Sequence, residues 1–136
     1  MTARLTGSCH CGAVAYECGP LIGAFGHCHC KTCQKVHAAP FITTGPIDLA
    51  DFRWTKGEDV VAYHESSPGK QRHFCPKCGT HMVAIYVESG QATLRIASLD
   101  EALDSKPAGH IWVSDKAWFF DFDDGLPHLR GAVPER

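Results

Sequence analysis

The sequence predicts a single, mainly β domain over residues 1–136. Three observations lead to this prediction. Many short segments are rich in β-branched and aromatic residues, turn-forming residues separate these segments, and no internal repeat, low-complexity stretch or linker interrupts them. A chain of 136 residues most simply forms one domain, and it is long enough to bury a core.

Seven segments have the composition of short strands, because they combine β-branched or aromatic residues with flanking turn formers. In chain order they are Ala13–Glu17, Phe41–Thr44, Val60–His64, Met82–Val87, Ala92–Ala97, His110–Val113 and Trp118–Phe122. The alternation of apolar and polar residues within Ala92–Ala97 indicates a strand with one face on the core.

Helices are expected to be few and short. One is predicted over Gln34–His37, directly after a cysteine, and another over Asp100–Leu103. The core is expected to include five aromatic side chains, namely Trp54, Trp112, Trp118, Phe119 and Phe120.

The charge and the apolar pattern exclude several classes of protein. A formal net charge of -2 and a pI near 6.5 argue against a nucleic-acid module, which carries a clustered basic face. The segment Met1–Thr6 has no apolar stretch typical of a signal peptide, and no run approaches the ~18 apolar residues of a membrane span. We therefore expect a cytoplasmic protein, whose reduced cysteines are better read as metal ligands than as disulfides.

Seven of the eight cysteines form three clusters with metal-ligand spacing. The clusters are Cys9-His10-Cys11, then Cys28-His29-Cys30-Lys31-Thr32-Cys33, and finally Cys75-Pro76-Lys77-Cys78. Seven sulfurs are one short of two complete four-thiolate sites. The simplest partition is one closed zinc site with four thiolates and one zinc site with three.

The closed site is predicted on Cys9, Cys11, Cys75 and Cys78 as a structural zinc centre. Pro76 presets a tight turn, and a glycine follows the last cysteine, as in a zinc knuckle. An alternative partition joins the last two of these cysteines to the final pair of the middle cluster, as in a zinc ribbon. We prefer the first partition because it keeps the middle cluster together.

The middle cluster, Cys28, Cys30 and Cys33, is predicted to hold a second zinc with an open fourth position. His37 lies one helical turn beyond the last of these cysteines. It could close the site as a fourth ligand, which would make it a structural Cys3His centre. Residues that alternate along an extended chain face opposite ways, so His29 is expected to point away from Cys28 and Cys30.

The type of ligand indicates the chemistry of an open site. Zinc with three thiolate ligands is a weak Lewis acid towards water but binds soft ligands well. A substrate thiol that docks there would lose its proton near neutral pH and become a nucleophile. The pattern therefore favours formation or cleavage of a carbon–sulfur bond over hydrolysis, whose zinc sites usually use histidine and carboxylate ligands.

Several motifs resemble the glutathione-dependent formaldehyde-activating enzyme family, whose domain also occurs in centromere protein V. They extend over nearly the whole chain and include the three cysteine clusters with their flanks. The segments that carry the resemblance are Gly7–Val14, Cys28–Cys33, Ala39–Phe41, Ser66–Gly69, Arg72–Thr80, His110–Val113 and Asp124–Pro127. Family members often carry a Ser-Gly pair where this chain has His37-Ala38.

This resemblance implies an Mss4-like fold of twisted antiparallel sheets with zinc knuckles. It implies a structural zinc on Cys9, Cys11, Cys75 and Cys78 and a catalytic zinc on Cys28, Cys30 and Cys33. The implied activity is that of a carbon–sulfur lyase that joins glutathione and formaldehyde as S-hydroxymethylglutathione. The partners would be a small thiol and an aldehyde.

Other polar residues are candidates for substrate contacts. His37 is a candidate acid that protonates the product oxygen, as is His29, and Lys35 and Arg72 are candidate contacts to a substrate carboxylate. Two other functions fit the cysteines. The first is a non-catalytic, zinc-stabilised binding module. The second is a thiol redox protein that uses Cys30 and Cys33.

Overall fold

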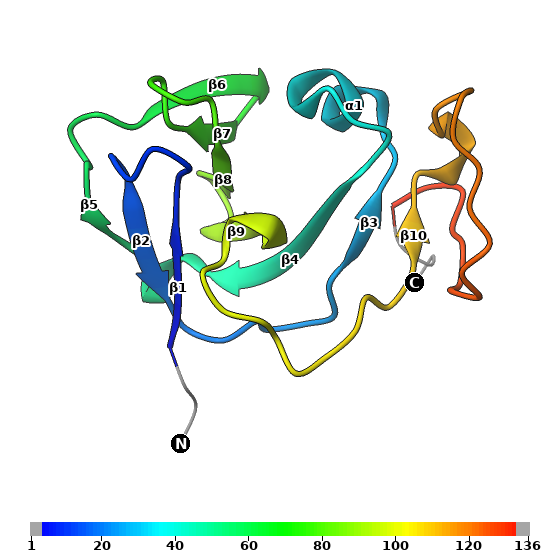
Figure 1. Cartoon of the computed structure of the whole chain (residues 1–136), viewed down its shortest axis with the longest axis horizontal. Coiled ribbons are helices and arrows are strands. Elements are labelled where there is room, and N and C mark those ends of the chain that lie inside the picture. Colours follow the sequence, from blue (N-terminus) through cyan, green and yellow to red (C-terminus); the bar gives the residue numbers. More distant parts are fainter. Residues whose placement is uncertain (1–3, 133–136) are drawn as a thin grey trace. The chain divides into compact units, whose positions relative to one another are not determined.

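A computed structural model describes residues 4–132, which fall into two compact units (Figure 1). Within the described part, unit 1 comprises residues 4–23 and 45–104, and unit 2 comprises residues 24–44 and 105–132. The prediction of one domain over 1–136 stays a prediction. Among the described helices, none is long and apolar enough to cross a membrane.

Unit 1 contains a three-stranded antiparallel sheet in the order β1-β2-β5. Its strands are β1 (Leu5–Ser8), β2 (Ala15–Cys18) and β5 (Arg53–Lys56). Every second residue of β2 is buried, so this strand alternates as a half-buried strand should. The 3₁₀ helix η1 (Leu49–Asp51) precedes β5.

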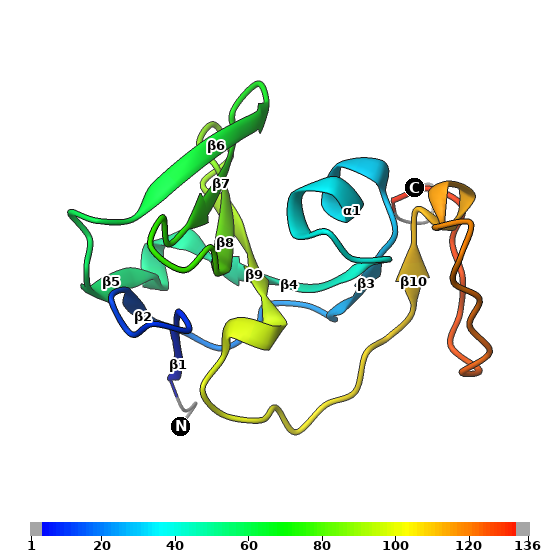
Figure 2. The same cartoon turned by 45° about the horizontal axis from the view of Figure 1, so that its top comes forward.

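The other strands of unit 1 follow the order β4-β9-β8-β7-β6, and the four strands from β6 to β9 are antiparallel neighbours (Figure 2). They are β6 (Ala62–Ser67), β7 (Lys70–Phe74), β8 (His81–Tyr86) and β9 (Gln91–Arg95), followed by the 3₁₀ helix η2 (Ile96–Ser98). Strand β4 (Ile42–Asp48) carries the chain from unit 2 into unit 1.

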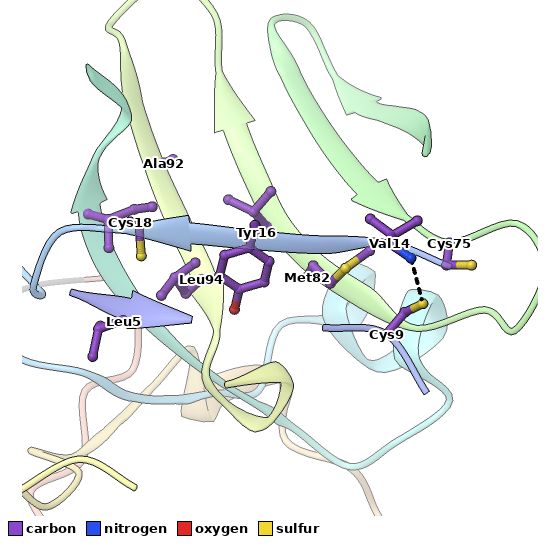
Figure 3. Packing of buried hydrophobic residues seen from close by; sticks show 11 residues of the cluster. Leu5, Cys9, Val14, Tyr16, Cys18, Cys75, Met82, Ala92 and Leu94 are labelled. Carbon is purple, nitrogen blue, oxygen red and sulfur yellow. Dashed lines mark hydrogen bonds between the residues drawn. The ribbon is translucent and has the colours of Figure 1, made fainter. Parts of the chain in front are cut away.

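The main hydrophobic core belongs to unit 1 (Figure 3). Tyr16 is 1% exposed and its hydroxyl pairs with Ser98 Oγ at 2.7 Å, so its polar end is satisfied inside the core. Figure 3 shows Cys9 and Cys75 at one end of this cluster and Cys18 at the other. Two predicted metal ligands are therefore continuous with the core.

Unit 2 is built around α1 (Lys31–His37) and three strand segments in the order β10-β3-β4. Strand β3 (Gly26–Cys28) pairs antiparallel with the first residues of β4 and parallel with β10 (His110–Ile111). The 3₁₀ helix η3 (Val113–Asp115) follows β10.

Two glycines of unit 2 allow backbones to approach closely. A Cβ on Gly26 would lie 2.7 Å from the carbonyl oxygen of Gly109, and a Cβ on Gly109 would lie 2.7 Å from that of Pro127. The backbone nitrogen of His110 donates to Pro127 O at 2.8 Å. Strand β10 is thus held between β3 and the segment around Pro127.

The prediction of a mainly β fold is confirmed: the described residues form two sheets and one α-helix. Six of the seven predicted strands overlap observed ones, and the helix predicted over Gln34–His37 is the second half of α1. Trp118–Phe122 is not a strand, and Asp100–Leu103 is not helical. Four observed strands were not predicted, namely β1, β3, β5 and β7.

The prediction of an aromatic core is wrong for three of the five residues. Trp118 is 89% exposed, Phe119 is 61% exposed and Trp112 is 38% exposed. The first two lie in a turn that the Lys116 ammonium group holds by donating to the carbonyl of Phe120 at 3.0 Å. Connecting segments run over the surface, where side chains have few neighbours to pack against.

Candidate metal centres

Four sulfurs of unit 1 form one group, as the sequence predicted. The Sγ atoms of Cys9, Cys11, Cys75 and Cys78 all lie within 4.8 Å of one another. Cys9 Sγ is 3.7 Å from Cys11 Sγ, which in turn is 3.8 Å from Cys75 Sγ. Zn–S bonds of about 2.3 Å at tetrahedral angles give sulfur–sulfur distances of about 3.8 Å, so the group fits a tetrahedral metal ion.

Each half of this four-cysteine group ends in a glycine turn. Gly12 and Gly79 have φ values of 81° and 82°, which a glycine adopts without a Cβ clash. The nitrogen of Gly12 donates to Cys9 O at 3.1 Å, and that of Gly79 donates to Cys75 O at 2.7 Å. The sequence predicted the turn after Cys78 as part of a zinc knuckle, and we call the two turns the two knuckles.

Thr80 joins the two knuckles and was missed as a site residue by the sequence analysis. Its Oγ1 accepts a hydrogen bond from the backbone nitrogen of His10 at 3.0 Å and lies 3.2 Å from Cys78 Sγ. This hydroxyl is the first cause that lowers the pKa of Cys78 to about 5, and the backbone hydrogen bonds of Cys11 and Thr80 add to it. The contact thus favours the thiolate form that a metal ion needs.

A second sulfur group lies in unit 2 and has three members. The Sγ atoms of Cys28, Cys30 and Cys33 lie within 4.8 Å of one another, and Cys28 and Cys33 are 3.7 Å apart. The sulfur–sulfur distance expected of a tetrahedral site is therefore found here too, with three donor atoms instead of four. All eight cysteines are free, so neither group is a set of disulfides.

Helix α1 positions two of these three sulfurs. Cys30 is its N-cap, and its Sγ accepts a hydrogen bond from the backbone nitrogen of Cys33 at 3.3 Å. At the other end, Ala38 is the C-cap with φ 50° and ψ 49°, in the left-handed region. This conformation explains why glycine suits that position in the resembling family.

Gln34 fixes the segment between the first two cysteines. Its side-chain amide nitrogen donates to the carbonyl of His29 at 2.6 Å and to that of Asp115 at 2.8 Å. The sequence analysis did not identify this residue as part of the site. Both amide hydrogens bind backbone oxygens, so Gln34 connects α1 to the chain on either side of it.

The donor set of the three-cysteine group fits a cation. The side chains of Cys30 and Cys33, followed by burial, raise the pKa of the Cys28 thiol. Three thiolates this close repel one another, and the positive charge of a bound metal ion would offset that repulsion, so each coordinating thiol would lose its proton. The two cysteine groups can therefore both hold metal ions.

The histidines near the three-cysteine group differ in their positions. His29 is 0% exposed and stacks on Phe122, and burial lowers its pKa to about 4. Its ring nitrogen Nε2 lies 2.8 Å from His110 Nδ1, and its ring is not among the donor atoms grouped with the three sulfurs. His37 is the last residue of α1, and among the described residues it is not part of the group of donor atoms within 4.8 Å.

The two predicted substrate cations lie in different units. Lys35 is exposed on α1 of unit 2. Arg72, on β7 of unit 1, is 2% exposed, and its Nε donates to Ser66 Oγ at 2.8 Å. Their contacts to a substrate carboxylate stay predictions.

Comparison with known families decides the affiliation of the chain. Residues 4–115 match the family described as glutathione-dependent formaldehyde-activating enzyme. The chain belongs to this family. The matched residues include every member of the two cysteine groups.

Two similar proteins extend this comparison. A protein of Halomonas elongata named a putative glutathione-dependent formaldehyde-activating enzyme is 31% identical over 83 residues, which cover 56% of this chain and 52% of that protein. The match thus spans about half the length of the curated relative. A crystal structure of a Rhodobacter sphaeroides protein matches with a TM-score of 0.61 and 22% identity, over 73% of this chain and 91% of the other. This likeness supports the fold.

Proposed function

We propose that this protein is a zinc-dependent carbon–sulfur lyase that forms or cleaves the adduct of a small thiol and an aldehyde. The family affiliation and the name of the Halomonas elongata relative suggest glutathione as the thiol and formaldehyde as the aldehyde. The observation that carries the proposal is a sulfur group with tetrahedral spacing and three members instead of four.

Two zinc ions per chain are part of the proposal. The four-cysteine group would hold a structural ion, because four thiolates complete a tetrahedron. The three-cysteine group would hold the catalytic ion through Cys28, Cys30 and Cys33. When bound there, zinc supplies an open position at which a soft thiol ligand loses its proton near neutral pH.

In the reaction, the thiol adds across the aldehyde carbonyl. A carbon–sulfur bond forms, the sulfur gives up its proton, and the carbonyl π pair moves to oxygen, which takes a proton. The product is a hemithioacetal, and the reverse steps release the aldehyde. No electrons are exchanged with a further reagent.

The chain's own residues would position this reaction. Cys33 and Cys30 are fixed by α1, and Gln34 holds the backbone between the first two ligands. His37 is partly exposed, whereas His29 is 0% exposed, so His37 is the better candidate to exchange a proton with the product oxygen. Lys35, exposed on the same helix, is proposed to bind a substrate carboxylate.

The reducing cytoplasm is the location we propose, since eight free thiols and thiolate metal sites persist there. The fold name Mss4-like is likewise part of the proposal. It is supported by the mainly β sheets and by the two knuckles with glycine turns.

Exchange spectroscopy tests the proposed function. NMR exchange between formaldehyde, glutathione and their adduct should accelerate with zinc-loaded wild type, and Cys30→Ser should abolish the acceleration while the fold persists. Cys18→Ala is the matched control, because Cys18 is a buried thiol outside both groups. No acceleration by well-folded protein with two zinc ions would reject this substrate pair and favour a binding module.

A further inference from the structure

Three residues that the proposed reaction does not use meet in one chain of hydrogen bonds in unit 2. His29 Nε2 lies 2.8 Å from His110 Nδ1, and His110 Nε2 lies 2.8 Å from Asp124 Oδ2. His29 directly follows β3, His110 is in β10 and Asp124 is in the segment after η3. We call this set the His-His-Asp chain.

The His-His-Asp chain runs from the interior to the surface of unit 2. His29 is 0% exposed and His110 is 2% exposed, whereas the side chain of Asp124 is 41% exposed. The His110 hydrogen bond holds the pKa of Asp124 below its usual range, with a second hydrogen bond from the backbone nitrogen of Leu126. The exposed end is therefore a carboxylate, and its bond to the ring is charge-assisted.

A carboxylate accepts hydrogen bonds and cannot donate them. Asp124 therefore determines which atom donates in each hydrogen bond of the His-His-Asp chain. His110 must carry its hydrogen on Nε2 to donate to Asp124. In a neutral ring, His110 Nδ1 is then an acceptor, so His29 must carry its hydrogen on Nε2 to donate to it. The structure thus predicts one tautomer for each histidine.

The backbone of the same residues is fixed as well. The nitrogen of His29 donates to the carbonyl of Ile111 at 3.0 Å, and its carbonyl accepts from Gln34. Strands β3 and β10 lie side by side in Figures 1 and 2, with His27 opposite His110 and Cys28 opposite Ile111. The residue between Cys28 and Cys30 is therefore held through its nitrogen, its carbonyl and its ring.

A metal ion is the competing explanation for this region. His27, His110 and Asp124 have donor atoms within 4.8 Å of one another. However, His110 uses both of its ring nitrogens at 2.8 Å, which is an ordinary hydrogen-bond length, and His27 Nδ1 pairs with Thr43 Oγ1 at 2.9 Å. The hydrogen-bonded chain accounts for both contacts of His110 without an ion.

We propose that His110 and Asp124 are positioning residues that act through His29 to hold Cys28 and Cys30 in their metal-binding arrangement. This inference rests on the proposed three-thiolate metal site. Side chains that orient ligands from outside a metal site typically change metal affinity by about 10–100-fold when they are altered. The two residues would thereby control how tightly the three-cysteine group retains its ion, whereas the four-cysteine group of unit 1 would be independent of them.

Asp124→Asn tests the proposal, because it keeps the size of the side chain but adds an amide donor. In the variant the amide nitrogen can donate to His110 Nε2. The hydrogen bonds of the His-His-Asp chain then no longer have to run in one direction. Nitrogen-15 shifts of the imidazole rings in zinc-loaded wild type should identify the Nε2–H tautomer of His29 and His110. The variant should shift both rings towards the Nδ1–H tautomer.

Zinc release provides the second measurement. Transfer of zinc to a chromophoric chelator should be about tenfold faster from the three-cysteine group of Asp124→Asn. Release from the four-cysteine group should be unchanged and serves as the internal reference. Asp123→Asn is the matched control, since it removes a neighbouring exposed carboxylate that lies outside the His-His-Asp chain. It should leave both measurements as in wild type.

Several outcomes would overturn the inference. Unchanged zinc release in Asp124→Asn would do so, whether or not the tautomers shift. A third equivalent of metal that moves the His27 and His110 resonances in wild type would replace the chain with a metal site. If wild type binds one ion, at the four-cysteine group alone, both the proposed function and this inference are wrong. If wild type binds two ions and Asp124→Asn releases zinc at the wild-type rate, only this inference is wrong.

Discussion

The four-cysteine group and the three-cysteine group both use thiol sulfurs at similar spacing, but they are built differently. The first draws its sulfurs from two segments, around Cys9 and Cys75, each turned by a glycine with positive φ. The second draws all its sulfurs from residues 28–33, and α1 fixes two of them. A closed group that joins distant segments suits stabilisation, whereas a three-donor group within one segment leaves room for a ligand.

The largest expected effect comes from breaking the closed group. Cys75→Ser removes a 0% exposed sulfur of this group, so the proposed ion should be lost and unit 1 destabilised by on the order of 5 kcal/mol or more. Thermal unfolding with metal analysis measures this. Cys33→Ser is the matched change in the other group and should leave the unfolding of unit 1 near wild type. Equal destabilisation by both would mean that the two groups have the same role.

Thr80 sharpens the comparison because it links the two segments that supply the four-cysteine group. Thr80→Val removes the hydroxyl that contacts Cys78 Sγ and the backbone of His10. Loss of a hydrogen bond to a charged sulfur should weaken metal binding by the four-cysteine group about tenfold. Metal competition with a chelator measures it, and Thr80→Ser, which keeps the hydroxyl, should bind as wild type does.

His81 gives unit 1 a pH dependence of its own. Burial, followed by the charges of Arg95 and Arg72, lowers the pKa of His81 from 6.5 to about 4. Between these values the unfolded chain binds the proton and the folded chain does not, so stability is present above pH 6.5 and falls as the pH drops towards 4. His81→Gln should reduce this loss by on the order of 1 kcal/mol in denaturant titrations at several pH values. An unchanged slope would show that other groups determine the acid sensitivity.

The smallest predicted effect is a gain in stability in unit 2. Ala38 has φ 50° at the C-cap of α1, where a side chain costs free energy and glycine does not. Ala38→Gly should stabilise unit 2 by about 0.5–1 kcal/mol, since relief of strain exceeds the extra entropy of the unfolded chain. Chemical denaturation measures it, and Ala39→Gly, one residue later, should instead be neutral or destabilising.

The sequence identified the members of the sulfur groups because ligand spacing is local. It left two partitions of the clusters open, and the structure has the one that keeps the middle cluster together. The sequence was less informative for strands such as β7, whose residues are mostly polar. The structure nevertheless buries Arg72 in this strand, which lies between β6 and β8 in the sheet. At Trp118 the aromatic side chain suggested a core residue, whereas the ring is exposed in a turn to which Lys116 donates a hydrogen bond.

The His-His-Asp chain was beyond prediction for a different reason. His29 and His110 are 81 residues apart in sequence, and nothing local to either residue indicates its partner. The only sequence signal was that both residues stand in family motifs although neither has a role in the proposed reaction. Motif positions without chemistry are therefore good places to look for hydrogen bonds that orient ligands.

The parallel pairing of β3 with β10 also has a consequence for the order of events during synthesis. Cys28, Cys30 and Cys33 leave the ribosome well before His110, because the chain between them must be made first. Contacts of such long sequence separation form slowly, since the entropy of closing the loop is lost before they stabilise anything. The nascent three-cysteine segment therefore meets cellular metal and oxidants before the strand that orders it exists.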